Sequence, residues 1–214
     1  MQVVTLLNQV NYFPLTITSS ETTTHTHGGG VFILVHKNLV TLEEPQFVTD
    51  CEIVWVKVKI KGNKDLFVGC FYMPHRNLNN LNELQKSLKN INTRENRHII
   101  LCGDFNCPDI NWETLQVPPC SSQRNVQQKL TEISIINNLT QIHHDTTRYT
   151  NTIDVIFTTN PSLIKSSVSV PGISDHHAIL VDSLIRPIIT NTKKRKVYAF
   201  TKANWYYIKL KGMA

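Results

Sequence analysis

The side chains best suited to chemistry lie where apolar, strand-like runs of this 214-residue chain begin or end. Asp104 and Asn106 directly follow one such run, and Asp175 and His176 lie just before another. Carboxylate, amide and imidazole groups at strand ends are typical of the active sites of α/β enzymes. The pattern indicates a metal-dependent phosphodiesterase, with a nuclease as the leading candidate in that class.

Asp104 and Asn106 are suited to binding a phosphate through a hard cation. Hydrolysis of a phosphodiester needs an activated water, neutralised phosphoryl oxygens and a stabilised leaving oxygen. Mg²⁺ meets the last two needs and prefers carboxylate and amide oxygens. The spacing of two residues points both side chains to one side if the strand geometry continues. The alternative interpretation is a simple turn, because Gly-Asp and Asn-Cys-Pro sequences form loops readily.

Asp154 and His176 form a candidate acid–base pair. Asp154 lies inside an otherwise apolar run, where a carboxylate without a partner is costly to bury. Imidazole is the usual general base near neutral pH, and an aspartate can orient its ring. The alternatives are an edge-strand aspartate that faces water and an ordinary loop histidine. His177, His143 and His144 have no comparable context, and we expect them to be structural or exposed.

Further candidates for phosphate contacts follow another apolar run, which ends on a rigid turn at Pro74. Tyr72 can donate a hydrogen bond to a phosphate or can simply cap the core. We also count His75, Arg76 and Arg148 among the candidate substrate contacts, although lone arginines are usually surface residues.

The elements that must position these residues follow from the hydrophobic periodicity. An apolar stripe through 78–91 predicts an amphipathic helix, and a second helix is expected at 123–137. Alternation through 53–60 predicts a half-buried strand, with Lys57 and Lys59 opposite its apolar face. This order fits an α/β sandwich with mixed sheets and helices packed outside. Other strands are expected at 31–35, 66–72, 98–105, 153–158, 168–170 and 178–183, with a hairpin turn at 61–65.

Composition is compatible with an enzyme that binds nucleic acid. The net charge is +6, from 22 Lys and Arg against 16 Asp and Glu, and a positive balance favours phosphate contacts. Many soluble domains are equally basic, so charge alone decides little. The five cysteines are odd in number and irregular in spacing, which argues against a disulfide framework and for a reducing compartment. No apolar stretch reaches the roughly 18 to 20 residues that span a bilayer, and we expect no signal peptide and no membrane association.

Taken in order, four motifs resemble those of the endonuclease/exonuclease/phosphatase superfamily. The greatest similarity is to the endonuclease domain of non-LTR (LINE-type) retrotransposons of arthropods, and it covers roughly residues 12–205. The resemblance implies a four-layer α/β sandwich with two mixed sheets flanked by helices. The motifs are Tyr72-x-Pro74-His75, Gly103-Asp104-Phe105-Asn106, Ile153-Asp154-Val155-Ile156 and Ser174-Asp175-His176, and the stretches 29–33, 104–112 and 152–157 are also similar.

The resemblance implies a role for each matching residue. His176 is then the general base, oriented by Asp154. Asp104 positions the nucleophile or protonates the leaving group. Asn106 and Tyr72 hold the phosphate.

The resemblance also implies a cofactor and partners. The residues expected at the metal, Mg²⁺ or alternatively Mn²⁺, are Asp104, Asn106, Asp175 and His176. The substrate is double-stranded DNA, of which one strand is nicked so that the 3′-hydroxyl primes reverse transcription. A reverse transcriptase domain is expected in the parent polyprotein, and the site of action is intracellular, and nuclear if the chain is active.

The N-terminal part departs from the family pattern. The family has an Asn and a Glu in its first strands, and that Glu is a main metal ligand. Neither motif is present here, because Asn8 lacks the expected surroundings and Glu21 lies in a Thr-rich stretch. We therefore expect an N-terminal truncation, with 1–29 degraded or irregular and the first strands missing. The catalytic domain is expected at 30–184 and a basic linker towards the absent reverse transcriptase at 185–214.

Three functions are compatible with these observations. The first is a Mg²⁺-dependent endonuclease domain that nicks DNA. The second is a catalytically inactive fragment that at most binds nucleic acid, an interpretation that the missing Glu favours. The third is a phosphoesterase for a lipid or inositol phosphate, against which the retrotransposon-like motifs and the basic charge count.

Overall fold

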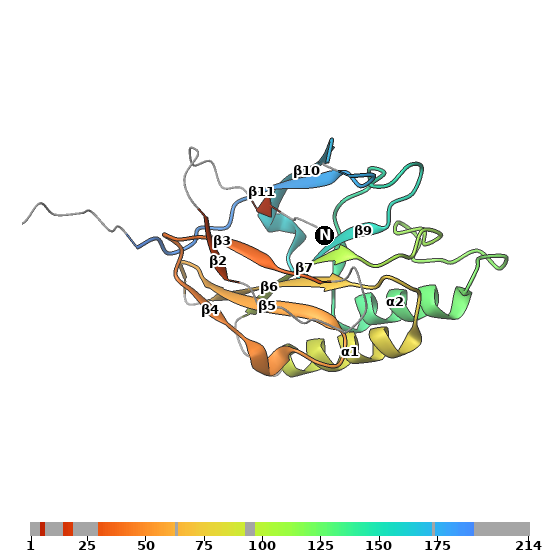
Figure 1. Ribbon diagram of the computed structural model, residues 1–214, viewed down its shortest axis with the longest axis horizontal. Coiled ribbons are helices and arrows are strands. Elements are labelled where there is room, and N and C mark those ends of the chain that lie inside the picture. Colours follow the sequence, from red (N-terminus) through yellow and green to blue (C-terminus); the bar gives the residue numbers. More distant parts are fainter. Residues whose placement is uncertain are drawn as a thin grey trace, which may run out of the picture.

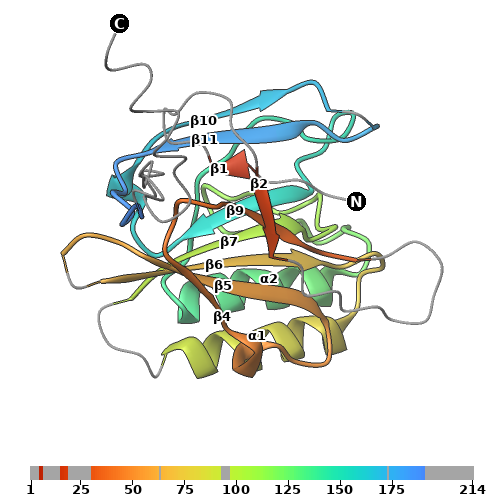
Figure 2. The ribbon, with the colours of Figure 1, turned by 60° about the vertical axis from the view of Figure 1, so that its left-hand side comes forward.

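The computed structural model is a layered α/β structure (Figure 1). It describes residues 30–62, 64–92, 97–172 and 174–190, together with the backbone of Thr5–Leu6 and Leu15–Thr18. In these parts of the chain, α1 (Leu78–Asn92) and α2 (Arg124–Ile136) lie against one face of a six-stranded sheet. Further strands cover the other face of this large sheet, as a second view also shows (Figure 2).

The large sheet has the strand order β4-β5-β6-β7-β9-β8 and is mixed, because β6 and β7 are parallel whereas its other pairs are antiparallel. The parallel pair is joined through α1, as a crossover connection requires. Its strands are β4 (Thr41–Glu43), β5 (Glu52–Lys59), β6 (Asp65–Tyr72), β7 (Arg97–Asp104), β8 (Thr140–Gln141) and β9 (Asp154–Thr158).

We call the strands on the other face the second layer. One sheet has the order β1-β11-β10 and the other pairs β2 with β3. Short 3-10 turns, η1 (Pro45–Phe47) and η2 (Pro161–Leu163), complete the described elements. The second layer consists of β1 (Thr5–Leu6), β2 (Leu15–Thr18), β3 (Ile33–His36), β10 (Ile164–Val170) and β11 (Ala178–Ser183).

The predicted mixed α/β sandwich is therefore confirmed, and the helices and strands expected from periodicity all occur near their predicted ranges. Both described helices cover the large sheet, so three layers are visible in the described part of the chain (Figure 1). None of the helices there is long and apolar enough to cross a membrane.

Two strands fall within 1–29, where the sequence predicted irregular structure and missing first strands. β1 pairs in parallel with β11, and β2 pairs antiparallel with β3. Strands of two and four residues are too short to give a clear hydrophobic period, so the sequence did not reveal them. Asn8 and Glu21 lie outside the described residues, as does 191–214 of the expected linker.

Strand β5 is buried on both faces, which corrects the prediction of a half-buried strand. Ile53 and Trp55 pack into the core under the helices, on the face that the alternation assigned to lysines and solvent. The side chain of Lys57 is only 19% exposed there, and its Nζ lies 2.5 Å from Glu44 Oε1. The helices cover this face, and sequence alternation cannot show that a helix will pack there.

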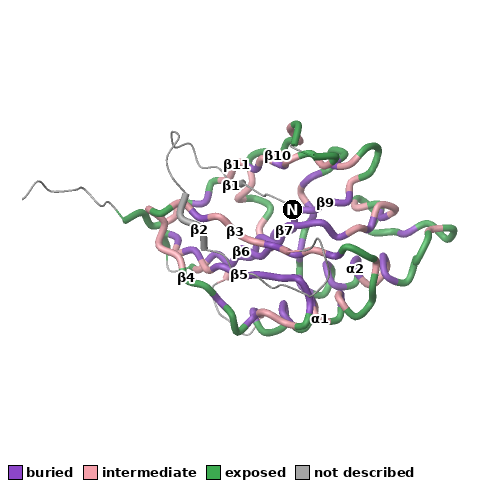
Figure 3. Tube along the Cα trace, viewed as in Figure 1, coloured by how far each residue is buried: buried purple, intermediate pink, exposed green. Residues whose placement is uncertain are grey.

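Apolar clusters cover both faces of the large sheet. The core on the helix side includes Phe71, Phe105 and Phe157, whose rings are in contact. The core between the sheets includes Ile156 and Val181. Buried segments are concentrated along β5, β6, β7 and β9, so the large sheet is the buried centre of the described part of the chain (Figure 3).

Buried His143 ties the segment after β8 to β10. Its Nδ1 lies 2.7 Å from Ser167 Oγ and its Nε2 lies 2.9 Å from Ser169 Oγ. Ser169 Oγ donates to the Thr146 carbonyl, so it accepts from Nε2–H, and Nδ1 accepts from Ser167. The neutral ring thus satisfies both nitrogens. Burial lowers the pKa of His143 below its ordinary value.

Replacing His143 with Gln should weaken the dependence of stability on pH. The pKa of His143 is near 6.5 in the unfolded chain and lower in the fold, so acid protonates the unfolded chain first. This stabilisation is fully present above about pH 6.5 and is lost as pH falls towards the lowered native pKa. Urea unfolding at about pH 7.5 and about pH 5 should show a smaller loss in His143→Gln than in the parent. An equal loss in both proteins would contradict this role.

Candidate active site

One line of paired residues across four neighbouring strands brings the polar side chains together. Glu52 of β5 is opposite Tyr72 of β6, Tyr72 is opposite Asp104 of β7, and Asp104 is opposite Asp154 of β9. Directly paired residues point to the same face of a sheet. This face is the one towards the second layer, because Ile156, two residues beyond Asp154, lies in the core between the sheets.

Asp104, Asp154 and His176 form a compact cluster. One ligand atom from each of them lies within 4.8 Å of those of the other two. Asp104 is 8% exposed and Asp154 is 2% exposed, whereas the side chain of His176 is 23% exposed. The cluster is therefore a buried pair of carboxylates with an imidazole at its opening.

The pairing between β7 and β9 explains the closeness of the two carboxylates. The Phe105 N–H donates to the Ile153 carbonyl at 2.9 Å, which places this pair at a hydrogen-bonded position of the antiparallel ladder. Such positions alternate, so Asp104 and Asp154 occupy the non-hydrogen-bonded type, in which Cα atoms are typically about 4.5 Å apart. Like charges at directly opposed positions destabilise a sheet.

His176 faces the Asp154 carboxylate through one ring nitrogen. Its Nδ1 lies 3.1 Å from Asp154 Oδ1 and 3.0 Å from Oδ2. An ionised carboxylate only accepts hydrogen bonds, so Nδ1 carries the hydrogen in this arrangement. The lone pair of the neutral ring is then at Nε2, where it is available as a base.

The environment of Asp104 opposes the negative charge of its carboxylate. Burial, and next the charge of Asp154, raise the pKa of Asp104 to about 6. The Asn106 N–H, which donates to Asp104 Oδ1 at 2.9 Å, acts in the opposite direction, as do the nearby charges of His176 and Arg148. A buried carboxyl group whose pKa is raised towards neutrality is characteristic of acid–base chemistry.

The backbone around Asp104 can be built only with Gly103. Gly103 has φ +147°, and a Cβ placed on it would lie 1.8 Å from the Phe71 carbonyl oxygen. Asn106 has φ 48°, and its Nδ2 donates to the Pro74 carbonyl at 3.0 Å. This tight approach of β7 and β6 places Asp104 and Asn106 beside the turn that follows Tyr72.

The loop that carries His176 is also held closely. A Cβ on Gly172 would lie 2.1 Å from the His176 carbonyl oxygen. The His177 N–H donates to the Thr147 carbonyl at 2.7 Å. Strand β11 begins at Ala178, so His176 is fixed between a tight loop and the start of a strand.

Arg148 and Asp175 form an ion pair beside the cluster. Arg148 Nε lies 2.8 Å and its Nη2 lies 2.6 Å from Asp175 Oδ2. The hydrogen bond from Arg148 lowers the pKa of Asp175. Asp175, which the sequence assigned to the metal site, is thus turned to Arg148 and is not among the three clustered residues.

The remaining predicted residues lie on or beside the turn after β6. Burial, followed by the charges of Asp104 and Glu52, raises the pKa of Tyr72, so its hydroxyl remains a hydrogen-bond donor. His75 is exposed on the turn. Arg76 donates through Nη1 to the Ser122 carbonyl at 3.0 Å, and therefore faces the loop before α2.

Two residues near the cluster were missed by the sequence analysis. Glu52 is buried beside Tyr72, and the hairpin turn between β5 and β6 could have revealed it, because counting outward from the turn pairs Glu52 with Tyr72. Thr147 is fully buried and bonds to the backbone of Asp154. No sequence pattern predicts that contact, because it depends on how the turn before β9 packs in the folded protein.

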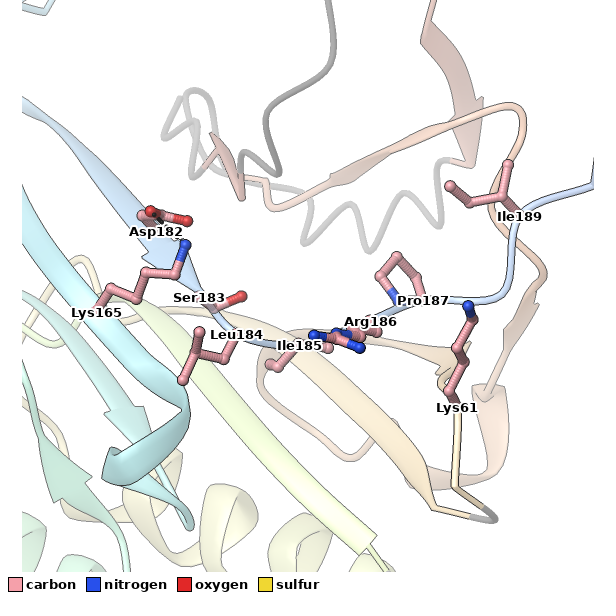
Figure 4. A pocket seen from close by; sticks show the side chains of 9 residues that line it. All are labelled: Lys61, Lys165, Asp182, Ser183, Leu184, Ile185, Arg186, Pro187 and Ile189. Atoms are coloured by element: carbon pink, nitrogen blue, oxygen red, sulfur yellow. Dashed lines mark hydrogen bonds and ion pairs between the residues drawn. The ribbon is translucent and has the colours of Figure 1, made fainter.

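A pocket of about 410 Å³ lies apart from this cluster (Figure 4). It is next to the end of β11 and the turn after β5, at the end of each strand away from His176 and Glu52. Its lining combines cations with aliphatic side chains, and Lys165 is already paired with Asp182 at 3.1 Å. The pocket is thus not the opening to the carboxylates. It is lined by Lys61, Lys165, Asp182, Ser183, Leu184, Ile185, Arg186, Pro187 and Ile189.

Comparison with known families decides the lineage. The family model described as endonuclease-reverse transcriptase matches residues 66–180, which is more than half of the chain. The chain belongs to this family. The match contains the β6–β7 unit with Tyr72 and Asp104, strand β9 with Asp154, and the loop with His176. This confirms the predicted relationship to the endonuclease/exonuclease/phosphatase superfamily.

Solved structures share the fold of this family member. The endonuclease domain of TRAS1, a telomere-specific non-LTR retrotransposon, matches with a TM-score of 0.60 and 15% identity, over 79% of this chain and 80% of that one. An endonuclease/exonuclease/phosphatase family protein from Leptotrichia buccalis matches with a TM-score of 0.50 and 19% identity, over 82% of this chain and 72% of that one. The human Nocturnin catalytic domain with bound sulfate matches with a TM-score of 0.50 and 16% identity, over 83% of this chain and 72% of that one. No curated protein matches the chain.

We predict that Gly103→Ala will destabilise the fold severely. The new Cβ would meet the Phe71 carbonyl, and backbone at this position cannot yield without separating β6 from β7. The matched control is Gly30→Ala, since Gly30 has φ +144° but a Cβ there meets nothing within 4 Å among the described residues. We expect a loss of about 1 kcal/mol for the control and at least about 3 kcal/mol for Gly103→Ala in chemical denaturation. Equal losses would show that the close approach is unimportant.

Proposed function

We propose that this chain is a divalent-cation-dependent endonuclease domain that hydrolyses one strand of double-stranded DNA. The observation that carries the proposal is the cluster of Asp104, Asp154 and His176, whose ligand atoms lie within 4.8 Å of one another. These residues stand at strand ends within the part of the chain that matches the endonuclease-reverse transcriptase family.

In this mechanism His176 is the general base. Asp154 accepts the hydrogen from Nδ1 and holds the ring, so Nε2 takes a proton from the attacking water. The partial exposure of His176 gives water access to the ring, whereas the burial of Asp154 keeps its carboxylate in one place.

Asp104 positions the nucleophile or protonates the leaving group. Its pKa of about 6 lies close enough to neutrality for the carboxyl group to exchange protons during turnover. The Asn106 N–H holds one oxygen of this carboxylate and so directs the other.

Three side chains bind the scissile phosphate. Tyr72 donates from its hydroxyl, which its raised pKa keeps protonated. Asn106 supplies its amide beside the same turn. Arg148 exchanges its partner Asp175 for the phosphate, since a guanidinium binds either anion through parallel hydrogen bonds. His75 and Arg76 extend this surface on the turn after β6.

The donor set suits a hard cation. Carboxylate oxygens dominate it, and two buried carboxylates that repel each other gain stability when a cation joins them. Asp104 and Asp154 would hold Mg²⁺, or Mn²⁺ in its place, with Asn106 beside them, and Asp175 would support the site from its edge. When bound, the cation neutralises the phosphoryl oxygens and stabilises the leaving oxygen.

DNA is the substrate most compatible with the charge and the relatives. The chain has a net charge of +6, and phosphate contacts supply most of the affinity of proteins for nucleic acid. The TRAS1 domain that shares the fold is an endonuclease of a non-LTR retrotransposon. By the same argument the partner in a parent polyprotein is a reverse transcriptase, and the nicking of DNA takes place in the nucleus.

We expect the purified chain to nick supercoiled plasmid in the presence of Mg²⁺ and to stop when EDTA is added. His176→Ala and Asp104→Asn should each lower the nicking rate at least about 100-fold, because each removes a proton-transfer group. Glu132→Gln, which changes an exposed acid on α2, is the matched control and should leave the rate unchanged.

Three outcomes would contradict the proposal. A folded protein that binds DNA in a salt-dependent manner without nicking it would be the inactive fragment that the missing Glu motif predicted. Nicking that persists in His176→Ala would place the chemistry elsewhere. Turnover of an inositol phosphate but not of DNA would assign the site to a different phosphoester.

A further inference from the structure

We propose that Thr147 is the positioning residue that fixes Asp154 relative to His176, an inference that rests on the proposed function. Thr147 is fully buried, although threonine is a polar residue and the surrounding loop is largely exposed. Its side chain bonds to the segment of Asp154 and its main chain bonds to the segment of His176. It touches none of the reacting groups and acts through the two segments that carry them.

The hydroxyl of Thr147 holds the beginning of β9. Its Oγ1 accepts from the Ile153 N–H at 3.1 Å and from the Asp154 N–H at 3.0 Å. A hydroxyl oxygen has two lone pairs, so both donors can be satisfied by this single atom. The amide of the catalytic aspartate is thus held by a side chain rather than by a neighbouring strand.

The geometry of the sheet explains why a side chain is needed there. On its outer edge β9 pairs with β8 at Thr140 and Gln141, and the last bond beyond them runs from the Ile142 N–H to the Ile156 carbonyl. Nearer to Asp154, the outer edge of β9 no longer pairs with β8. At this part of the edge the Thr147 hydroxyl accepts hydrogen bonds from two backbone N–H groups, which would otherwise be buried without a partner.

The main chain of Thr147 makes the second half of the connection. Its carbonyl accepts from the His177 N–H at 2.7 Å. Its N–H donates to the Asn151 carbonyl at 2.8 Å, which closes the turn that leads back to Ile153. His177 is adjacent to His176, so one rigid residue links the backbone of the general base to that of its orienting carboxylate.

This link has a direct chemical consequence. The distance from His176 Nδ1 to the Asp154 oxygens, 3.0 to 3.1 Å, depends on the relative position of two segments from different sheets. A misplacement of about 1 Å in a catalytic constellation can reduce the rate by a factor of about 100. The hydroxyl of Thr147 should therefore affect kcat, although it lies outside the reaction.

The test compares Thr147→Val, Thr147→Ser and Thr158→Val in plasmid nicking and in amide hydrogen exchange. Valine keeps the shape of threonine but removes the acceptor, whereas serine keeps the acceptor. Thr158 is the matched control, since it is a buried threonine on the same strand whose Oγ1 accepts one backbone N–H, from Asn160 at 3.1 Å.

We expect Thr147→Val to lower kcat at least about tenfold with KM changed less than about twofold, because the phosphate contacts remain. The Ile153 and Asp154 amides should exchange at least about tenfold faster than in the parent protein. Thr147→Ser should restore both properties to within about threefold, and Thr158→Val should leave both unchanged.

The exchange measurement separates the two hypotheses. If the parent protein does not nick DNA, the proposed function fails. Faster exchange of the Ile153 and Asp154 amides in Thr147→Val, but not in Thr158→Val, would still support the structural link. If the parent nicks DNA and Thr147→Val behaves like Thr158→Val in both measurements, the role of Thr147 is overturned. A loss of kcat that Thr147→Ser does not restore would also overturn it.

Discussion

The whole site depends on two carboxylates that face each other across the β7–β9 ladder. Asp104 and Asp154 are directly opposed at the closer kind of antiparallel pair, and both are buried. Such an arrangement lowers stability unless positive charge or hydrogen-bond donors surround it. The rest of the structure near this point supplies those groups, and a fold that keeps a costly pair of this kind is characteristic of a functional site.

Compensation for this charge comes from three separate parts of the chain. His176 approaches Asp154 from the loop before β11, the Asn106 N–H bonds Asp104 from the loop after β7, and Arg148 adds positive charge from the turn before β9. These segments belong to different sheets and loops, so the site exists only when both layers are assembled. Apolar packing holds the layers together, and the assembled layers then place these polar atoms beside one another.

Sequence alone predicted the parts of this arrangement that depend on local patterns. The apolar stripe of α1 and the runs of β6, β7 and β9 are local, and the motifs with Asp104, Asp154 and His176 were found because they adjoin those runs. Contacts that depend on distant segments could not be predicted. Asp175 turns to Arg148, and Thr147 reaches the edge of β9, because a folded turn brings them there. The helix-side burial of β5 was missed for the same reason.

We propose that Asp104 and Asp154 are placed together to receive a divalent cation, and Mn²⁺ binding followed by electron paramagnetic resonance tests this proposal most directly. The parent chain and the control Glu132→Gln should each bind Mn²⁺ with the same affinity, and binding should weaken at least about tenfold in Asp104→Asn and in Asp154→Asn. Equal Mn²⁺ affinity in all four proteins would contradict this proposal, because the opposed carboxylates would then hold no cation.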